Sequence, residues 1–347
     1  MTGDLDALAP RLRDWLSGQL SGAEDLRLSG MFEPAQGYSS RTLVFTAHWN
    51  EGGTEHEKGF VARLQRTVSC PLLADIFHQQ RVMSVASAVP GVPVPVPIAV
   101  EPDADVLGDP FFLMERAEGQ VPPDFPSYHS QGWVADLALL DQKRLWWNGM
   151  EAMERLHRID WRQFGNLVEG VSQPPDARFY IRRFIVPWFE WAANGRDFPA
   201  IANAIADLVA KAPPVSRAGL TWNDARPGNV MFDKGLEVSA LFDFEVATLG
   251  PAEIDIAWWL YADVIFSEAF GVPPLAGIPT VEEALPGLER LYGRALPDLS
   301  YYLALAALKH AVISIRDYGN DKREAHEGGH IAFALSHLDR YLGDWTA

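Results

Sequence analysis

The chain has 347 residues, of which 48% are hydrophobic and 22% charged, an ordinary globular composition with enough length for two domains. Lysine and arginine number 29 against 46 aspartates and glutamates, and the formal charge of -17 repels nucleic acid and anionic lipid, so we expect neither as a partner. The single cysteine, Cys70, excludes an intrachain disulfide and favours a location in the reducing cytoplasm.

The first 116 residues predict one helix and then a region rich in strands. Residues 1–20 carry leucines at helical spacing without the basic start of a signal sequence, which indicates a surface helix. A second helix is predicted over residues 72–88, followed by an extended stretch that proline repeats keep out of the helical region. Alternating β-branched and aromatic residues predict strands over residues 41–49, 59–64 and 111–114.

Beyond Gly119 the apolar spacing predicts long helices. They cover residues 133–158, 177–193, 201–211, 252–270, 281–296, 301–318 and from near 330 to 342. The apolar stretch around Lys309 and His310 is too short for a bilayer, which favours a buried helix and no membrane partner. We therefore expect a β-rich lobe over residues 1–117 and a helical lobe over residues 118–347, with a cleft where they join.

The most informative segment lies within the helical part. It carries Asp224, Asn229 five residues later, and Asp243 after two predicted strands over residues 230–232 and 239–242. For Asp224 or Asn229 alone, an Asx turn that leads into a strand is the favoured interpretation. The three together follow the order in which a kinase-type site presents a base, a metal-binding amide and a metal-binding carboxylate.

A second motif, His326-Glu-Gly-Gly-His330, has the HExxH pattern of zinc hydrolases. That chemistry needs both histidines one helical turn apart, and each intervening glycine weakens a helix by about 1 kcal/mol. No glutamate follows before the C-terminus to serve as a third ligand. We therefore favour a loop-to-helix junction with solvated histidines, and a zinc hydrolase is the less favoured alternative.

From about Gln36 to Asp263, and in a general way to its end, the chain resembles the aminoglycoside phosphotransferase and choline-kinase-like family, a branch of the protein-kinase-like fold. The chain is most similar to the bacterial members that are grouped with acyl-CoA dehydrogenases. The resemblance implies an α+β fold with two lobes, a small antiparallel β-rich N-terminal lobe that binds nucleotide and a larger helical C-terminal lobe that binds the acceptor.

The resemblance also implies roles for individual residues. Asp224 would be the catalytic base and Arg226 would steady the transferred phosphoryl group. Asn229 and Asp243 would hold Mg²⁺, while Asp255 would support the catalytic loop from behind. The residues implied in nucleotide binding are Gly37, Ser39 and Ser40 in the phosphate-covering loop, Arg63 as the phosphate-binding cation, and Met114, Glu115 and Arg116 at the adenine hinge.

The chain departs from the family pattern at three places. Trp222-Asn223 stands where the family has His-Gly, Arg63 replaces a lysine, and Gln79 replaces the glutamate that would pair with it. Arginine keeps the charge and can bind two phosphate oxygens. We expect the Gln79 amide to hydrogen-bond Arg63 in place of an ion pair.

These features predict transfer of phosphate from ATP or GTP, with Mg²⁺, to a hydroxyl of a small molecule; the alternative is an inactive nucleotide-binding pseudokinase. A helical lobe rich in tryptophan and phenylalanine favours a bulky apolar or ring-bearing acceptor if some of these rings line the cleft. Three arginines between residues 178 and 183 would instead suit an acidic or CoA-like acceptor. The pattern does not distinguish oligomeric states.

Overall fold

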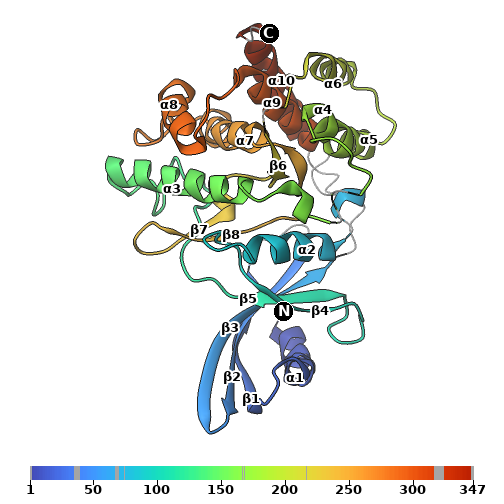
Figure 1. Cartoon of the computed structure of the whole chain (residues 1–347), viewed down its shortest axis with the longest axis vertical. Helices are drawn as coiled ribbons and strands as arrows, with labels where there is room; N and C mark the ends of the chain where they lie inside the picture. The colour runs from blue at the N-terminus through green and yellow to red at the C-terminus, as the bar shows by residue number, and fades with distance from the viewer. Residues whose placement is uncertain are drawn as a thin grey trace.

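The computed structural model describes residues 2–34, 40–66, 70–73, 75–165, 167, 169–215, 217–315 and 324–344. A β-sheet with two flanking helices forms one end of the molecule, and the helices that follow residue 138 form the other end (Figure 1). None of the helices in the described part of the chain is long and apolar enough to cross a lipid bilayer.

The described residues form a five-stranded antiparallel sheet in the order β1-β2-β3-β5-β4. The strands are β1 (Glu24–Phe32), β2 (Ser40–Glu51), β3 (Thr54–Gln65), β4 (Pro97–Glu101) and β5 (Phe111–Glu115). The three strands predicted from alternation correspond to β2, β3 and β5. The edge strands β1 and β4 lack that signal, because much of β1 is exposed and β4 begins at a proline, as edge strands can.

Two helices cover the two faces of this sheet. Leu8, Leu12 and Leu16 of α1 (Thr2–Gln19) pack in one apolar cluster with Leu43 and Phe45 of β2. On the other face, α2 (Ile76–Ser87) lies between the sheet and the helical part (Figure 1). The side chain between those two strand residues, Val44, belongs to the core that includes α2, as the two-residue period of a strand requires.

The rest of the chain is mainly helical. Its helices are α3 (Leu139–His157), α4 (Ala177–Tyr180), α5 (Val186–Ala193), α6 (Pro199–Lys211), α7 (Glu253–Val264), α8 (Val281–Tyr292), α9 (Ser300–Ser314) and α10 (Glu324–Asp344). Two π-helical turns, Ile181–Ile185 and Ile265–Ala269, extend α4 and α7. Residues 301 to 312 of α9 are all buried, which agrees with the expected buried helix.

Two helix predictions need correction. The helix expected from residue 133 starts only at Leu139, after a series of turns. The backbone is helical from Glu324, so the loop-to-helix junction expected around His326 and His330 is wrong. An added Cβ at Gly329 would meet no atom within 4 Å, so this glycine lies on an open helix face, where its cost in helix propensity is offset by the packing of α10 on α9.

Candidate functional site

Two short antiparallel ribbons hold the segment that carries the candidate site. β6 (Ala218–Thr221) pairs with β9 (Thr248–Pro251), and β7 (Val230–Phe232) pairs with β8 (Val238–Leu241). The hairpin expected after Asn229 is therefore present. Val230 lies opposite Leu241, and the amide of Phe242 donates to the carbonyl of Asn229 at 2.9 Å. The start of β7 and the end of β8 thus bring Asn229 and Asp243 to the same end of the hairpin.

Three side chains donate hydrogen bonds to the Asp224 carboxylate. Nδ2 of Asn229 lies 2.6 Å from Oδ2, Nε1 of Trp258 lies 3.1 Å from Oδ1, and Nε of Arg226 lies 3.2 Å from Oδ2. Burial acts to raise the pKa of Asp224, but the charges of Arg226 and Lys309 and these hydrogen bonds lower it below its ordinary value. Asp224 is therefore an ionised, fixed carboxylate with a quarter of its side chain exposed.

Asp243 has the opposite electrostatic environment. Its backbone adopts φ 61°, and its buried Oδ1 accepts no hydrogen bond within the described part of the chain. Nη2 of Arg63 lies 3.7 Å from that oxygen, at ion-pair distance. Burial raises the pKa of Asp243, and the negative charge of Asp224 adds to this effect although Arg63 and Arg226 oppose it. A buried carboxylate oxygen without a donor is the kind of group that a cation stabilises.

The donor set fits Mg²⁺. Nδ2 of Asn229 is used by Asp224, which leaves its Oδ1 as the oxygen that can face a metal. Within the described residues, no three His, Cys, Asp or Glu side chains gather closely enough to hold a metal by themselves. Mg²⁺ does not need such a cage, because proteins usually hold it with one or two carboxylates while phosphates and water complete the shell.

Arg226 is held by a carboxylate that the sequence analysis did not identify. Its Nη1 donates to both oxygens of Asp124, at 2.6 and 2.7 Å. Gly228 leaves room for this pair, since a Cβ there would lie 2.3 Å from both Nη1 of Arg226 and Oδ1 of Asp124. Asp124 lies 102 residues before its partner, so local patterns carry no signal for this contact.

Asp255 fastens the segment from behind. It lies in the first turn of α7, is fully buried, and accepts hydrogen bonds from the backbone amides of Trp222 at 2.6 Å and Asn223 at 2.8 Å. Nε2 of His157 donates to the same carboxylate at 2.9 Å. His157, the last residue of α3, is thus part of the support for this loop.

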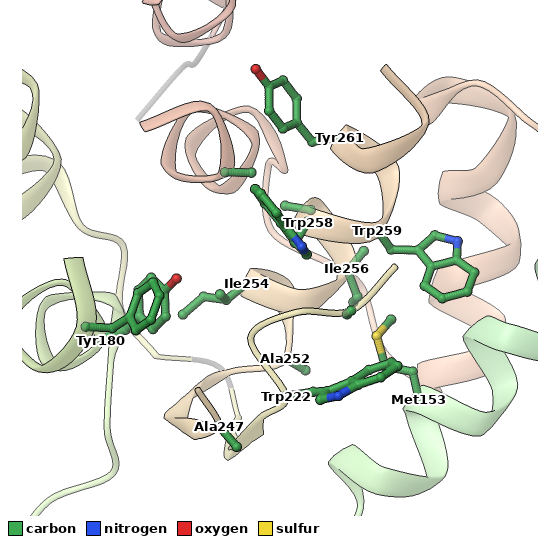
Figure 2. Close-up of a cluster of buried hydrophobic side chains, with 14 of the residues drawn as sticks. Met153, Tyr180, Trp222, Ala247, Ala252, Ile254, Ile256, Trp258, Trp259 and Tyr261 are labelled. Atoms are coloured by element: carbon green, nitrogen blue, oxygen red, sulfur yellow. The ribbon is translucent and has the colours of Figure 1, made fainter. Parts of the chain in front are cut away.

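The unusual pair Trp222-Asn223 also fastens the loop. Asn223 has φ 71°, a conformation that asparagine tolerates better than most residues. Its side-chain Oδ1 accepts from the hydroxyl of Tyr180, and its Nδ2 donates to the carbonyl of Val246, both at 2.8 Å. Nε1 of Trp222 donates to the carbonyl of Phe242, directly before Asp243, at 2.7 Å. Figure 2 shows the indole of Trp222 beside Met153 in the buried cluster below α7.

Lys309 is a second charged residue that sequence reasoning missed. It is buried in α9, donates to the carbonyl of Asn223, and lies 3.7 Å from the centre of the Trp258 ring. Burial lowers its pKa to about 8, although Asp224 and Asp255 act in the opposite direction. The signal in the sequence was a lysine within an apolar helix, which by itself does not indicate its partners.

The residues predicted to contact the nucleotide lie partly inside and partly outside the described part of the chain. Gly37 and Ser39 lie outside the described residues, while Ser40 is the buried first residue of β2. The hydrogen bond expected between Gln79 and Arg63 is not formed, because Oε1 of Gln79 and Nε of Arg63 both lack hydrogen-bond partners in the described part of the chain. The guanidinium instead lies near Asp243 and Glu245, 4.0 Å from the latter.

At the predicted hinge, Met114 is buried, while Glu115 pairs with Lys58 and Arg116 with Glu118. The backbone amides of Glu115 and Arg116 donate to the carbonyls of Val96 and Gly59, both at 3.0 Å.

Of the zinc-type motif, His330 lies in α10 with its ring centre 5.6 Å from that of His310. The side chain of His326 lies outside the described residues.

Comparison with known proteins gives one family. The model of the phosphotransferase enzyme family matches residues 33–295. A chicken (Gallus gallus) protein named acyl-CoA dehydrogenase family member 11 is 27% identical over 293 residues, which are 80% of this chain and 35% of that protein. Mouse (Mus musculus) family member 10 is 27% identical over 258 residues, 69% of this chain and 22% of that protein. The chain thus spans about a third or less of the length of these relatives.

Solved structures share the fold. A Ralstonia eutropha protein provisionally named an aminoglycoside phosphotransferase has a TM-score of 0.73 at 20% identity, covering 97% of this chain and 99% of that one. An aminoglycoside phosphotransferase in complex with ADP and hygromycin B has a TM-score of 0.58 at 18% identity, covering 97% and 99%. A Plasmodium vivax ethanolamine kinase has a TM-score of 0.54 at 12% identity, covering 91% and 82%. The expected two-lobe kinase-like α+β fold is confirmed.

Proposed function

This chain belongs to the phosphotransferase enzyme family, and we propose that it transfers the γ-phosphate of ATP to a hydroxyl of a small molecule. One observation carries the proposal: an ionised carboxylate, Asp224, is fixed by Asn229 at the end of a hairpin whose other strand leads to Asp243, a carboxylate with a buried oxygen that accepts no hydrogen bond among the described residues. In the relatives of known structure, the names include ADP, hygromycin B and ethanolamine, which favours a nucleotide and a small acceptor.

Asp224 is suited to the role of base. Its carboxylate is negatively charged at neutral pH and is kept in position by Asn229 and Trp258. In the proposed reaction, the acceptor hydroxyl gives its proton to Asp224, its oxygen bonds to the γ-phosphorus, and the bond from that phosphorus to the bridging oxygen breaks, which releases ADP. Positioning and charge neutralisation supply most of the rate enhancement in such transfers.

Asn229 and Asp243 would hold Mg²⁺ through Oδ1 of the amide and the carboxylate. When bound, the metal neutralises charge on the phosphate oxygens. Arg63, within 4.0 Å of both Asp243 and Glu245, would move its guanidinium toward the phosphates of the nucleotide. Arg226 would remain tied to Asp124 and present its charge to the transferred phosphoryl group.

A pseudokinase that binds nucleotide without transfer is the second candidate. The observation that favours it is the missing hydrogen bond between Arg63 and Gln79, which leaves the guanidinium without a brace from this residue of α2. Binding without turnover would distinguish this candidate from an active enzyme.

The experiment is turnover of γ-labelled ATP by the purified chain with a panel of alcohols, compared with the Asp224→Ala variant. Because general base catalysis contributes on the order of 10²–10⁴-fold, we expect turnover to fall by that factor while ATP binding persists. Asp207→Ala, on the exposed face of α6, is the matched control and should retain activity. Equal turnover by the Asp224→Ala variant would remove Asp224 from the mechanism.

A further inference from the structure

We propose that the acceptor binds against an aromatic wall formed by Phe125, Phe266 and Phe270, and that it is an alcohol with an apolar aliphatic or aromatic body. This inference rests on the proposed function, and it assigns the acceptor side of the same site. The wall is distinct from the aromatic core of the helical lobe, whose members Trp146, Trp161, Trp188, Tyr180 and Phe184 are all buried.

The segment that carries Phe125 is attached to the catalytic loop. Its neighbour Asp124 accepts both short hydrogen bonds from Nη1 of Arg226, and Nε of the same guanidinium lies 3.2 Å from Asp224. Consecutive Cα atoms are about 3.8 Å apart, so the backbone of Phe125 directly adjoins that of Asp124, whose carboxylate binds the guanidinium beside Asp224. An acceptor whose hydroxyl reaches Asp224 can therefore extend its body toward Phe125.

Phe125 is the exposed end of a continuous set of rings. Its side chain is 65% exposed, which is unusual for phenylalanine, a residue usually found inside. Its ring centre lies 5.5 Å from Phe270, which stacks on Phe266 at 5.7 Å, which in turn lies 5.5 Å from Tyr128. Tyr128 is buried and donates to Asp263 at 2.6 Å, so the inner end of the set is fixed.

The wall is connected to the base through α7. Phe266 belongs to the π-helical turn that directly continues this helix, and the helix also carries Trp258, which donates to Asp224. The hydroxyl of Ser127 donates to the carbonyl of Phe266, which ties the segment after Phe125 to the same turn. Both sides of the wall are thus supported by elements that contact the candidate catalytic residues.

The charges near the wall argue against a cationic acceptor. Three carboxylates within three residues of these phenylalanines in the sequence already have partners: Asp124 is bound by Arg226, Asp263 accepts from Tyr128 and Trp146, and Glu268 lies 3.3 Å from His337. Arg226 would also repel an ammonium group. An uncharged apolar body gains from burial of the exposed Phe125 ring and needs no counter-charge.

The test measures the binding of 4-phenylbutan-1-ol to the full chain by ligand-observed NMR. Choline and kanamycin are the cationic comparison ligands. We expect the aromatic alcohol to bind and Phe125→Ala to raise its Kd about tenfold, because the variant removes the exposed ring against which the apolar body would be buried. Leu140→Ala removes an apolar side chain that is 81% exposed on α3 and is the matched control, with no change expected. Both positions are exposed, so neither variant should impair folding.

The proposal is overturned if Phe125→Ala leaves the Kd unchanged, if choline or kanamycin binds more tightly than the aromatic alcohol, or if wild-type protein does not bind the alcohol at all. Measuring the Kd of the alcohol without nucleotide, and also in the Asp224→Ala variant, tests the wall independently of phosphate transfer and so separates this result from the proposed function. Phosphate transfer to some alcohol that Phe125→Ala does not affect would contradict the wall while the proposed function stands.

Discussion

At the scale of residues, the site is a balance of buried charges. The charges of Arg226 and Lys309, with the hydrogen bonds from Asn229 and Trp258, outweigh the effect of burial on the pKa of Asp224 and lower it. At Asp243, the charge of Arg63 does not outweigh burial and the neighbouring Asp224, so its pKa is raised. The two carboxylates therefore differ in their proton affinity: Asp224 stays ionised at neutral pH, while the raised pKa of Asp243 marks a buried negative charge that a cation would stabilise.

Lys309 gives a prediction about pH. Burial lowers its pKa to about 8 from the ordinary 10.5, so above pH 8 the unfolded chain holds a proton that the folded chain has lost. Stability must then rise with pH between these values, by on the order of 1–2 kcal/mol from pH 7 to 9.5. Lys309→Met should lack this rise in urea unfolding experiments, whereas Lys211→Met, at an exposed lysine on α6, should keep it. The same slope in all three proteins would show that Lys309 does not titrate in this range.

At the scale of elements, local patterns predicted the hairpin between Asn229 and Asp243 well. Asp224, Asn229 and the β7–β8 hairpin lie within a short segment whose turn chemistry is local: Asp233 accepts from the amides of Gly235 and Glu237 at 2.7 and 3.0 Å. The short strands β6 and β9, of four residues each, were missed because the pairing that defines them joins segments about 30 residues apart.

The supporting contacts could not be predicted from the sequence for the same reason. Asp124 meets Arg226 and Lys309 meets Asn223 only because helices α7 and α9 and the segment after the sheet pack around the catalytic loop. A local pattern shows the residue type at each position, but not which partner tertiary packing brings to it. The roles of the individual site residues stay predictions until they are measured.

The contact of the Trp259 ring of α7 with Gly149 of α3 yields a test of packing. A Cβ at Gly149 would lie 2.4 Å from Cη2 of Trp259, which is a fully buried side chain. We expect Gly149→Ala to destabilise the protein by about 1–3 kcal/mol, as overpacking does in a filled core. Gly329→Ala, on the open face of α10, should instead be neutral or stabilise by about 0.5–1 kcal/mol. Thermal unfolding of both variants measures the difference, and equal effects would contradict the close approach of the Trp259 ring to Gly149.

At the scale of the whole molecule, α2 and its neighbouring segments connect the sheet to the candidate site. Nε2 of His78, on α2, donates to the carbonyl of Ala247 at 2.9 Å, a few residues after Asp243. The amide of Leu241, in β8, donates to the carbonyl of Pro93 at 2.7 Å. The segment that carries Asp243 faces Arg63 of β3 and is therefore held by contacts from both lobes. A nucleotide bound between the two lobes would bridge the same two parts.

The most direct test of the account is calorimetric titration of the chain with a non-hydrolysable ATP analogue, with and without Mg²⁺, for the wild type and for Asp243→Asn. Asparagine tolerates the left-handed backbone at this position, so the variant should remain folded. The account predicts that Mg²⁺ tightens binding to the wild type by about tenfold or more and that Asp243→Asn loses most of this gain. Equal affinity of the wild type with and without Mg²⁺, or no binding of the analogue, would contradict it.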